Sequence, residues 1–238
     1  DYDFESLLKD FVELEKKSID AKTRFNSAIK IIDLKISNGH ADEELLKEIT
    51  NYKKKYKANN QQMILELKSS QLLFYLKKFD LLKENLIDKL KIIPRDNMYY
   101  NNFIDGMILI MLFNNKNEEL EKFSESIYDI KKMDFNNALK GFTQLSLSDN
   151  QSIVNLSLYF KSYIHIMQKN YTLSQSIVST INDYDIFSQL TLLIWAEIDD
   201  YIHDDKNAAV DKYLEFLEKY ETSIFYEDIR IRLGEIIG

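Results

Sequence analysis

The sequence predicts an all-α protein in which a long antiparallel helical hairpin at the N-terminus is followed by an α-solenoid. Two observations support this: helix breakers are scarce, and apolar residues recur at helical spacing. The 238-residue chain has one proline and five glycines, and these are the residues that interrupt helices. Apolar residues make up 45% and charged residues 29%, which is typical of a globular chain rather than a disordered one.

Charge divides the chain into two parts. Residues 1–79 hold 15 Lys and Arg against 13 Asp and Glu, whereas residues 80–238 hold 16 against 26. Chance variation between solvated helix faces would also give this difference. Because the helix pattern changes at the same point, we predict a hairpin over residues 1–78 and a repeat domain over residues 79–238. The net charge of −8 disfavours a nucleic-acid partner, since phosphate binding needs clustered positive charge.

Several classes of chemistry and topology find no support in the sequence. The chain has no cysteine, which excludes thiolate catalysis, Cys-based zinc sites and disulfides. The longest apolar run, Met107–Phe113, is far shorter than the ~20 residues of a membrane span. The chain begins at DYDFESLL without an initiator Met or apolar leader, which fits a signal or anchor segment removed from its N-terminus.

The first predicted helix of the hairpin carries an a/d heptad stripe, the pattern of a helix that packs along a partner helix. The stripe consists of Phe4, Leu7, Phe11, Leu14, Ser18, Ala21, Phe25, Ala28 and Ile32. Gly39 is expected to end this helix in the left-handed conformation. Asp42 is expected to cap the next helix. The same capping role is expected in the repeat region for Asp134, Asn170 and Asp205.

The second predicted helix carries Leu45, Ile49, Tyr52, Tyr56, Met63, Leu67 and Phe74 on one face. Together the two helices would form a hairpin about 55 Å long at ~1.5 Å per residue. Tyr52 and Tyr56 fit the seam of the hairpin, with a protein-binding platform as the alternative. The four lysines midway along this helix fit a solvated face, with an acidic partner or a lipid surface as the alternative.

A repeated string organises the rest of the chain. KKMDFNNALKGF at residues 131–142 aligns with segments that begin at Leu76, Gln168 and His203. The alignment places Leu82, Ala138, Ser174 and Ala209 in register, and the last three are 36 and 35 residues apart. A small residue suits the point where two helices approach most closely. Four positions later a large residue fills the gap, at Leu86, Phe142, Val178 and Tyr213.

This period and the helix–turn–helix unit resemble tetratricopeptide repeats. Pro94, twelve residues after Leu82, stands where such arrays often end the second helix of a repeat. Asn150 and Glu221 replace that proline elsewhere, and the 56 residues between Leu82 and Ala138 leave room for an irregular helical unit over residues 95–133. The resemblance implies a scaffold whose first helices line a concave face.

The whole layout resembles a spirochaetal cell-envelope protein with a helical hairpin followed by a tetratricopeptide-like domain. It is also similar to the membrane-anchored ancillary subunit of the bacterial secretion translocon. These resemblances imply an extracytoplasmic protein on the periplasmic side of a membrane, tethered by a removed N-terminal segment. Its partner would be another envelope protein, bound through the hairpin or the concave face.

Catalytic motifs are not found, and we expect no enzyme activity and no cofactor. His40 falls in the predicted hairpin turn, and His165 falls in a predicted helix without an acidic residue nearby. Neither is predicted to have a partner that would make it a general base. The segment EIDDYIHDD is the one cluster that merits a test, because Asp199, Asp200 and His203 could face a cation from one helix. Solvated charges at a helix end are the plainer interpretation of this cluster.

Three functions follow from these features. The first is a protein–protein interaction scaffold, with candidate contacts at Asn155, Tyr159, Tyr163 and Tyr201; packing between helices is the alternative role of each tyrosine. The second is a structural protein that assembles as a homodimer through the hairpin. The third is a metal-dependent protein that uses the Asp199, Asp200 and His203 cluster.

Overall fold

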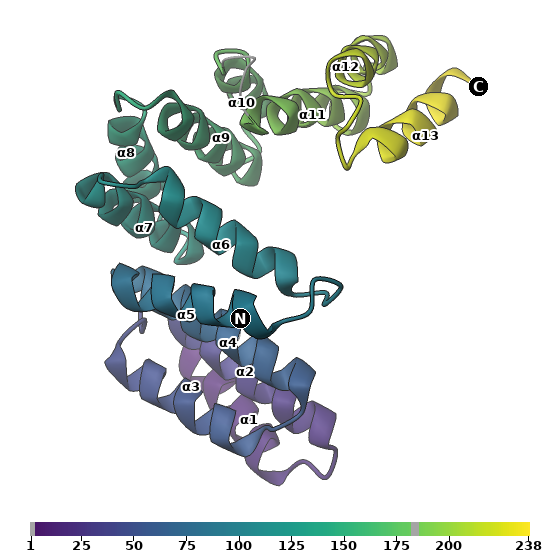
Figure 1. Ribbon diagram of the computed structural model, residues 1–238. Coiled ribbons are helices and arrows are strands. Elements are labelled where there is room, and N and C mark those ends of the chain that lie inside the picture. The colour runs from purple at the N-terminus through teal and green to yellow at the C-terminus, as the bar shows by residue number, and fades with distance from the viewer. Residues whose placement is uncertain (1–2, 182–185) are drawn as a thin grey trace. The chain divides into compact units, whose positions relative to one another are not determined.

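The computed structural model describes residues 3–181 and 186–238, and over these residues the protein is all-α (Figure 1). The predicted fold class is confirmed, since the described residues form thirteen helices and no strand. The helices are α1 Phe4–Lys17, α2 Ala21–Ser37, α3 Glu43–Lys55, α4 Asn59–Tyr75, α5 Phe79–Ile92, α6 Tyr100–Leu112, α7 Asn117–Lys131, α8 Phe135–Leu145, α9 Gln151–Met167, α10 Tyr171–Val178, α11 Ile186–Tyr201, α12 Lys206–Lys219 and α13 Tyr226–Ile237. None of them is both long and apolar enough to traverse a lipid bilayer.

Two compact units make up the chain, Asp1–Ala138 and Leu139–Gly238. They are called here the first unit and the second unit. The boundary that the sequence pattern places after residue 78 is a different division, and it stays a prediction.

The prediction of two long helices in the N-terminal region is wrong, because each of them is interrupted and forms two shorter helices. α1 ends at Lys17 and α2 begins at Ala21, where the Asp20 carboxylate accepts hydrogen bonds from the backbone N–H of Lys22 (3.3 Å) and Thr23 (2.8 Å). This cap stabilises a new helix start in the middle of the heptad stripe. The stripe is buried in α2, at Phe25, Ala28 and Ile32, whereas Leu14 of α1 is 44% exposed.

The second break separates α3 from α4 at residues 56–58. The α4 cap position, Ala58, makes no side-chain hydrogen bond. Tertiary contacts of Tyr56 fix this break instead, because its ring meets Phe25 edge to face at 5.2 Å and its hydroxyl donates to Glu15 at 2.7 Å. Self-association through the hairpin stays a prediction.

The turn between α2 and α3 follows the sequence prediction. Gly39 has φ of +90°, a conformation that only glycine adopts readily. The Asp42 carboxylate accepts a hydrogen bond from the N–H of Leu45 at 2.8 Å. One core cluster of the first unit gathers side chains from α2, α3 and α4 and from Tyr56 in the break between α3 and α4: Phe25, Ala28, Ile32, Ile36, Leu45, Ile49, Tyr56, Leu65 and Leu72.

A left-handed turn marks each aligned repeat segment. Lys77, Met133, Lys169 and Asp204 all have φ between 55° and 61°, and each stands five positions before its aligned residue. Those aligned residues are buried: Leu82 is 4% exposed, and Ala138, Ser174 and Ala209 are 0% exposed. The sequence register therefore corresponds to a recurring local structure.

The irregular region contains one more copy of this turn, which the sequence alignment missed. Asn115 has φ of 63°, and Leu120, five positions later, is 3% exposed. The residue that follows four positions after Leu120 is Ser124, whose hydroxyl donates to the carbonyl oxygen of Phe74. A serine in place of a large apolar residue hid this copy from the sequence pattern.

Helices of the second unit pack in consecutive pairs. α9 packs against both α10 and α11, α11 packs against α12, and α12 packs against α13. Two of the three caps predicted in the repeat region are confirmed, since Asp134 accepts from the N–H of Asn137 and Asp205 from the N–H of Ala208. The third is confirmed in position only, since Asn170 is the N-cap residue of α10 but its side chain makes no capping hydrogen bond.

Candidate functional site

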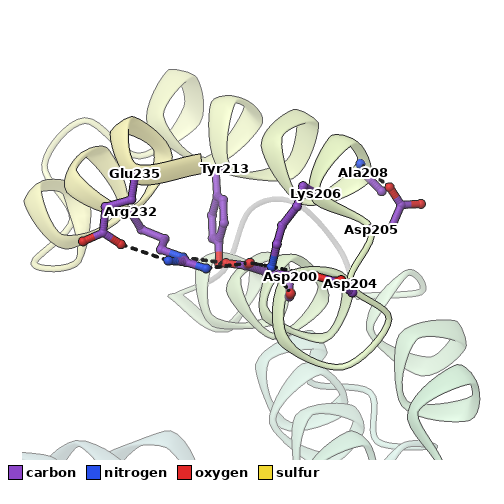
Figure 2. A network of polar contacts seen from close by, with 8 residues as sticks. All are labelled: Asp200, Asp204, Asp205, Lys206, Ala208, Tyr213, Arg232 and Glu235. Atoms are coloured by element: carbon purple, nitrogen blue, oxygen red, sulfur yellow. Dashed lines mark hydrogen bonds and ion pairs between the residues drawn. The ribbon is translucent and has the colours of Figure 1, made fainter. Parts of the chain in front are cut away.

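A buried carboxylate organises the C-terminal end of the second unit (Figure 2). The Asp200 side chain, on α11, is 0% exposed. Its two oxygens accept from Arg232 of α13, Nε to Oδ2 at 2.8 Å and Nη2 to Oδ1 at 2.9 Å. Lys206 Nζ donates to Oδ1 at 2.8 Å, and the Tyr213 hydroxyl donates to Oδ2 at 3.0 Å. We call these four residues the Asp200 network.

The Asp200 network ties three helices together. Lys206 at the start of α12 also donates to the backbone carbonyl of Asp200 at 2.6 Å and pairs with Asp204 at 3.1 Å. Arg232 pairs with Glu235 at 2.9 Å, and its guanidinium lies 4.8 Å from the centre of the Tyr201 ring. The planar, bidentate contact from Arg232 therefore fixes α13 to the end of α11.

Electrostatics keep this carboxylate ionised. Hydrogen bonds from Arg232, then from Lys206 and Tyr213, hold the pKa of Asp200 well below its usual range, although burial opposes that shift. The pKa of Tyr213 is raised, first by burial and then by its hydrogen bond to Asp200. A charge this strongly paired is suited to fixing helices and has no proton to exchange near neutral pH.

The structure does not bring Asp199, Asp200 and His203 onto one cation. Asp199 accepts from Gln175 Nε2 at 2.7 Å and lies 3.1 Å from His203 Nδ1. Asp200 faces the other way, toward Arg232 and Lys206, and its oxygens are already occupied by donors. Among the residues that the structure describes, no three His, Cys, Asp or Glu side chains are grouped as metal ligands.

Helix α9 carries two of the tyrosines predicted as contact residues, Tyr159 and Tyr163, and Met167, which the sequence pattern did not single out, lies on the same helix. Tyr159, Tyr163 and Met167 follow one another at intervals of four, with Tyr163 40% and Met167 41% exposed. Tyr159 is partly buried and meets the Phe160 ring edge to face at 5.4 Å. Burial raises the pKa of Tyr159, and the neighbouring Tyr163 adds to that shift. We call Tyr159, Tyr163 and Met167 the α9 stripe.

The other predicted contact residues have structural surroundings. Asn155 is 1% exposed and accepts a hydrogen bond from Gln151, so its amide lies in the interior rather than on a binding face. Tyr201 is 60% exposed, but its ring lies against Arg232. Tyr56 is 7% exposed within the core, and Tyr52 packs on that core while its hydroxyl donates to Glu48 at 3.1 Å.

The sequence pattern missed Arg232 as the main partner of Asp200. The two residues are 32 positions apart, and Arg232 occurs in a terminal segment whose apolar spacing predicts only a helix. One signal was present: an aspartate aligned with the interior face of a helix needs a cation to pair with it. Arg232 of the last helix meets that need, together with Lys206 of α12.

Comparisons with known proteins identify no relative of the chain. A scan of protein-family models, a search of curated proteins and a search of solved structures each find no match. The class of protein is therefore defined by its own structure: an all-α protein of helices in a repeat-like arrangement.

Proposed function

We propose that this protein is a non-enzymatic scaffold that binds an extended peptide segment of a protein partner on the α9 stripe. One observation carries the proposal: Tyr163 and Met167 are exposed on α9, although other side chains of this helix pack against neighbouring helices. Helix pairs of the tetratricopeptide-like kind line their concave face with the first helix of each pair. The packing of α9 on α10 and on α11 supports assigning it that position.

The charge around the stripe favours a partner with acidic side chains. Residues 150–181 contain no Asp or Glu but include Lys161 and Lys169. In contrast, the second unit as a whole holds 15 acidic and 8 basic residues between positions 139 and 238. Carboxylates of a bound peptide would therefore meet less repulsion beside α9 than beside the acidic segments of the second unit. Aromatic and methionine side chains there supply contact area for its apolar residues.

The cell envelope is the proposed location, on the strength of the layout that the sequence resembles. There the protein would be tethered by an N-terminal segment and would bring an envelope protein to the membrane surface. Fractionation of the source organism tests this: a tethered protein stays with membranes in high salt and is released by detergent. Recovery in the salt wash contradicts the tether.

Peptide display tests the binding surface directly. Peptides tiled from the proteins of the source organism are selected on the purified chain, and affinities are measured by fluorescence anisotropy. The double variant Tyr163→Ala/Met167→Ala is expected to lose about tenfold or more in affinity, because two partly buried contacts are truncated. Tyr159 is left intact because of its packing on Phe160.

The matched control is Leu214→Ala/Ile231→Ala, which removes two comparably exposed apolar side chains from α12 and α13. It is expected to bind peptide like the unaltered protein. The melting temperatures of both variants, measured by circular dichroism, must match that of the unaltered protein. Equal affinity in the Tyr163 and Met167 variant contradicts the proposal, and so does a loss of fold, which would make these residues part of the core.

A further inference from the structure

A fixed loop exposes an isoleucine between α1 and α2. Ile19 is 97% exposed. The loop backbone is held on both sides, because Arg24 Nη1 donates to the carbonyl oxygens of Ser18 (2.7 Å) and Ile19 (2.9 Å), and Asp20 caps α2. An exposed single apolar side chain is ordinary on a surface. This one is distinguished by its fixed position at a loop tip and by the charges around it.

The α3–α4 loop lies beside it at the same end of the first unit (Figure 1). Glu15, near the end of α1, joins the two loops: it accepts from Lys55 Nζ and from the Tyr56 hydroxyl. Tyr56 in turn packs against Phe25 of α2. Residues 13–24 and 53–57 therefore form one surface, which we call the basic end.

The basic end has the opposite charge to the chain. It holds eight basic residues and three acidic ones, a balance of +5, whereas the whole chain has −8. The three acidic residues are used internally, Glu13 with Lys17, Glu15 with Lys55 and Asp20 as a helix cap. The exposed residues Lys16, Lys22, Lys54 and Lys57 form no ion pair within the described part of the chain.

We propose that the basic end docks on an anionic lipid surface, with Ile19 entering the headgroup layer and the lysines contacting lipid phosphates. An exposed apolar side chain on a lysine-rich surface matches the layered chemistry of a membrane surface, in which an anionic headgroup layer covers an apolar interior. An acidic protein would satisfy the lysines but leave Ile19 without a function. This surface lies in the first unit and is independent of the peptide-binding proposal for α9.

Vesicle co-sedimentation of the full chain tests the proposal. Binding is expected with vesicles of phosphatidylcholine and phosphatidylglycerol, absent with phosphatidylcholine alone, and lost in high salt because exposed charges are screened. Lys54→Gln/Lys57→Gln is expected to weaken binding about fivefold per lysine. Ile19→Ser is expected to weaken it roughly tenfold through the loss of apolar burial.

Matched controls place the same changes elsewhere. Lys47→Gln/Lys83→Gln removes two exposed lysines of the first unit outside the basic end, and Ile224→Ser removes a comparably exposed isoleucine (86%) from the loop before α13. Both should bind vesicles like the unaltered chain. Absence of binding to anionic vesicles at low salt overturns the proposal. The proposal is also overturned if Ile19→Ser binds vesicles as strongly as the unaltered chain and soluble polyglutamate competes equally well against both proteins. That result would favour an acidic protein partner.

Discussion

Each unit contains a buried carboxylate that joins helices, and the two are paired differently. Glu15 in the first unit is 6% exposed and accepts from one cation, Lys55, and one neutral hydroxyl, that of Tyr56. Asp200 in the second unit has a fully buried side chain and accepts from two cations and one hydroxyl. The first joins two helix breaks, whereas the second fixes the last helix to the unit.

The difference shows that the contribution of a buried charge to stability depends on how its partners are held. Lys55 is 48% exposed, so it can turn to water when the Glu15 charge is removed. Arg232 is 26% exposed and makes a two-point contact with Asp200. We therefore expect the second unit to depend on its carboxylate more than the first unit depends on Glu15.

Asp200→Asn has the largest expected effect. The substitution removes the charge that two cations face and brings an NH₂ donor against their donors, which should lower the free energy of unfolding by about 3 kcal/mol. Amide hydrogen exchange should show loss of protection concentrated in α13. Asp204→Asn is the control, because that side chain is 85% exposed and its ion pair within the described residues is with Lys206. Equal unfolding free energies for the two variants would contradict the conclusion that the Asp200 network stabilises the second unit.

Glu15→Gln is expected to cost less, about 1.5 kcal/mol, measured by urea denaturation. The amide oxygen of the new side chain would still accept from the Tyr56 hydroxyl, and only the contact to Lys55 would lose its charge. Glu13→Gln alters an exposed carboxylate close to Glu15 in the same helix, and it should leave the denaturation midpoint unchanged. A cost larger than that of Asp200→Asn would reverse the comparison between the two units.

Lowering the pH should reduce the stability that the charge of Asp200 contributes, without changing the shape of the side chain. Because the folded-state pKa of Asp200 lies below its unfolded value, its contribution is complete above about pH 5 and declines as the pH falls through the unfolded pKa of ~3.9. The gap in unfolding free energy between the unaltered chain and Asp200→Asn should narrow by about 1 kcal/mol between pH 7 and pH 3. A gap that stays constant to pH 3 would mean that the charge is not what stabilises the folded state.

The sequence predicts the fold class and the repeat register because both depend on local chemistry. Scarce breakers predict helices, and a small residue at the aligned repeat position predicts the closest approach of two helices. Ala138, Ser174 and Ala209 meet that expectation, each with 0% exposure. Asp42 and Gly39 likewise act through their immediate neighbours.

Features that depend on distant contacts were not predictable in the same way. The heptad pattern continues through residues 18–20, where the chain leaves the helix, and the break at Tyr56 reflects its contacts with Glu15 and Phe25. Asn155 has a polar side chain that suggests exposure, but its neighbours bury it. Whether a side chain on a helix is buried depends on the next helix, and one sequence does not position that helix.

The smallest expected effect concerns a neutral polar pair in the second unit. The hydroxyls of Ser162 and Ser174 lie 2.7 Å apart, and both residues are 0% exposed. Ser174→Ala matches the alanine of the aligned positions 138 and 209, and should cost about 0.5 kcal/mol, because Ser162 can bond to a carbonyl of its own helix. The double variant Ser162→Ala/Ser174→Ala should regain most of that loss, since neither hydroxyl is then left unpaired. If the double variant is less stable than the single one, the neutral hydroxyl pair stabilises the fold as the buried carboxylates Glu15 and Asp200 do. Charge alone would then not explain the difference between those two carboxylates.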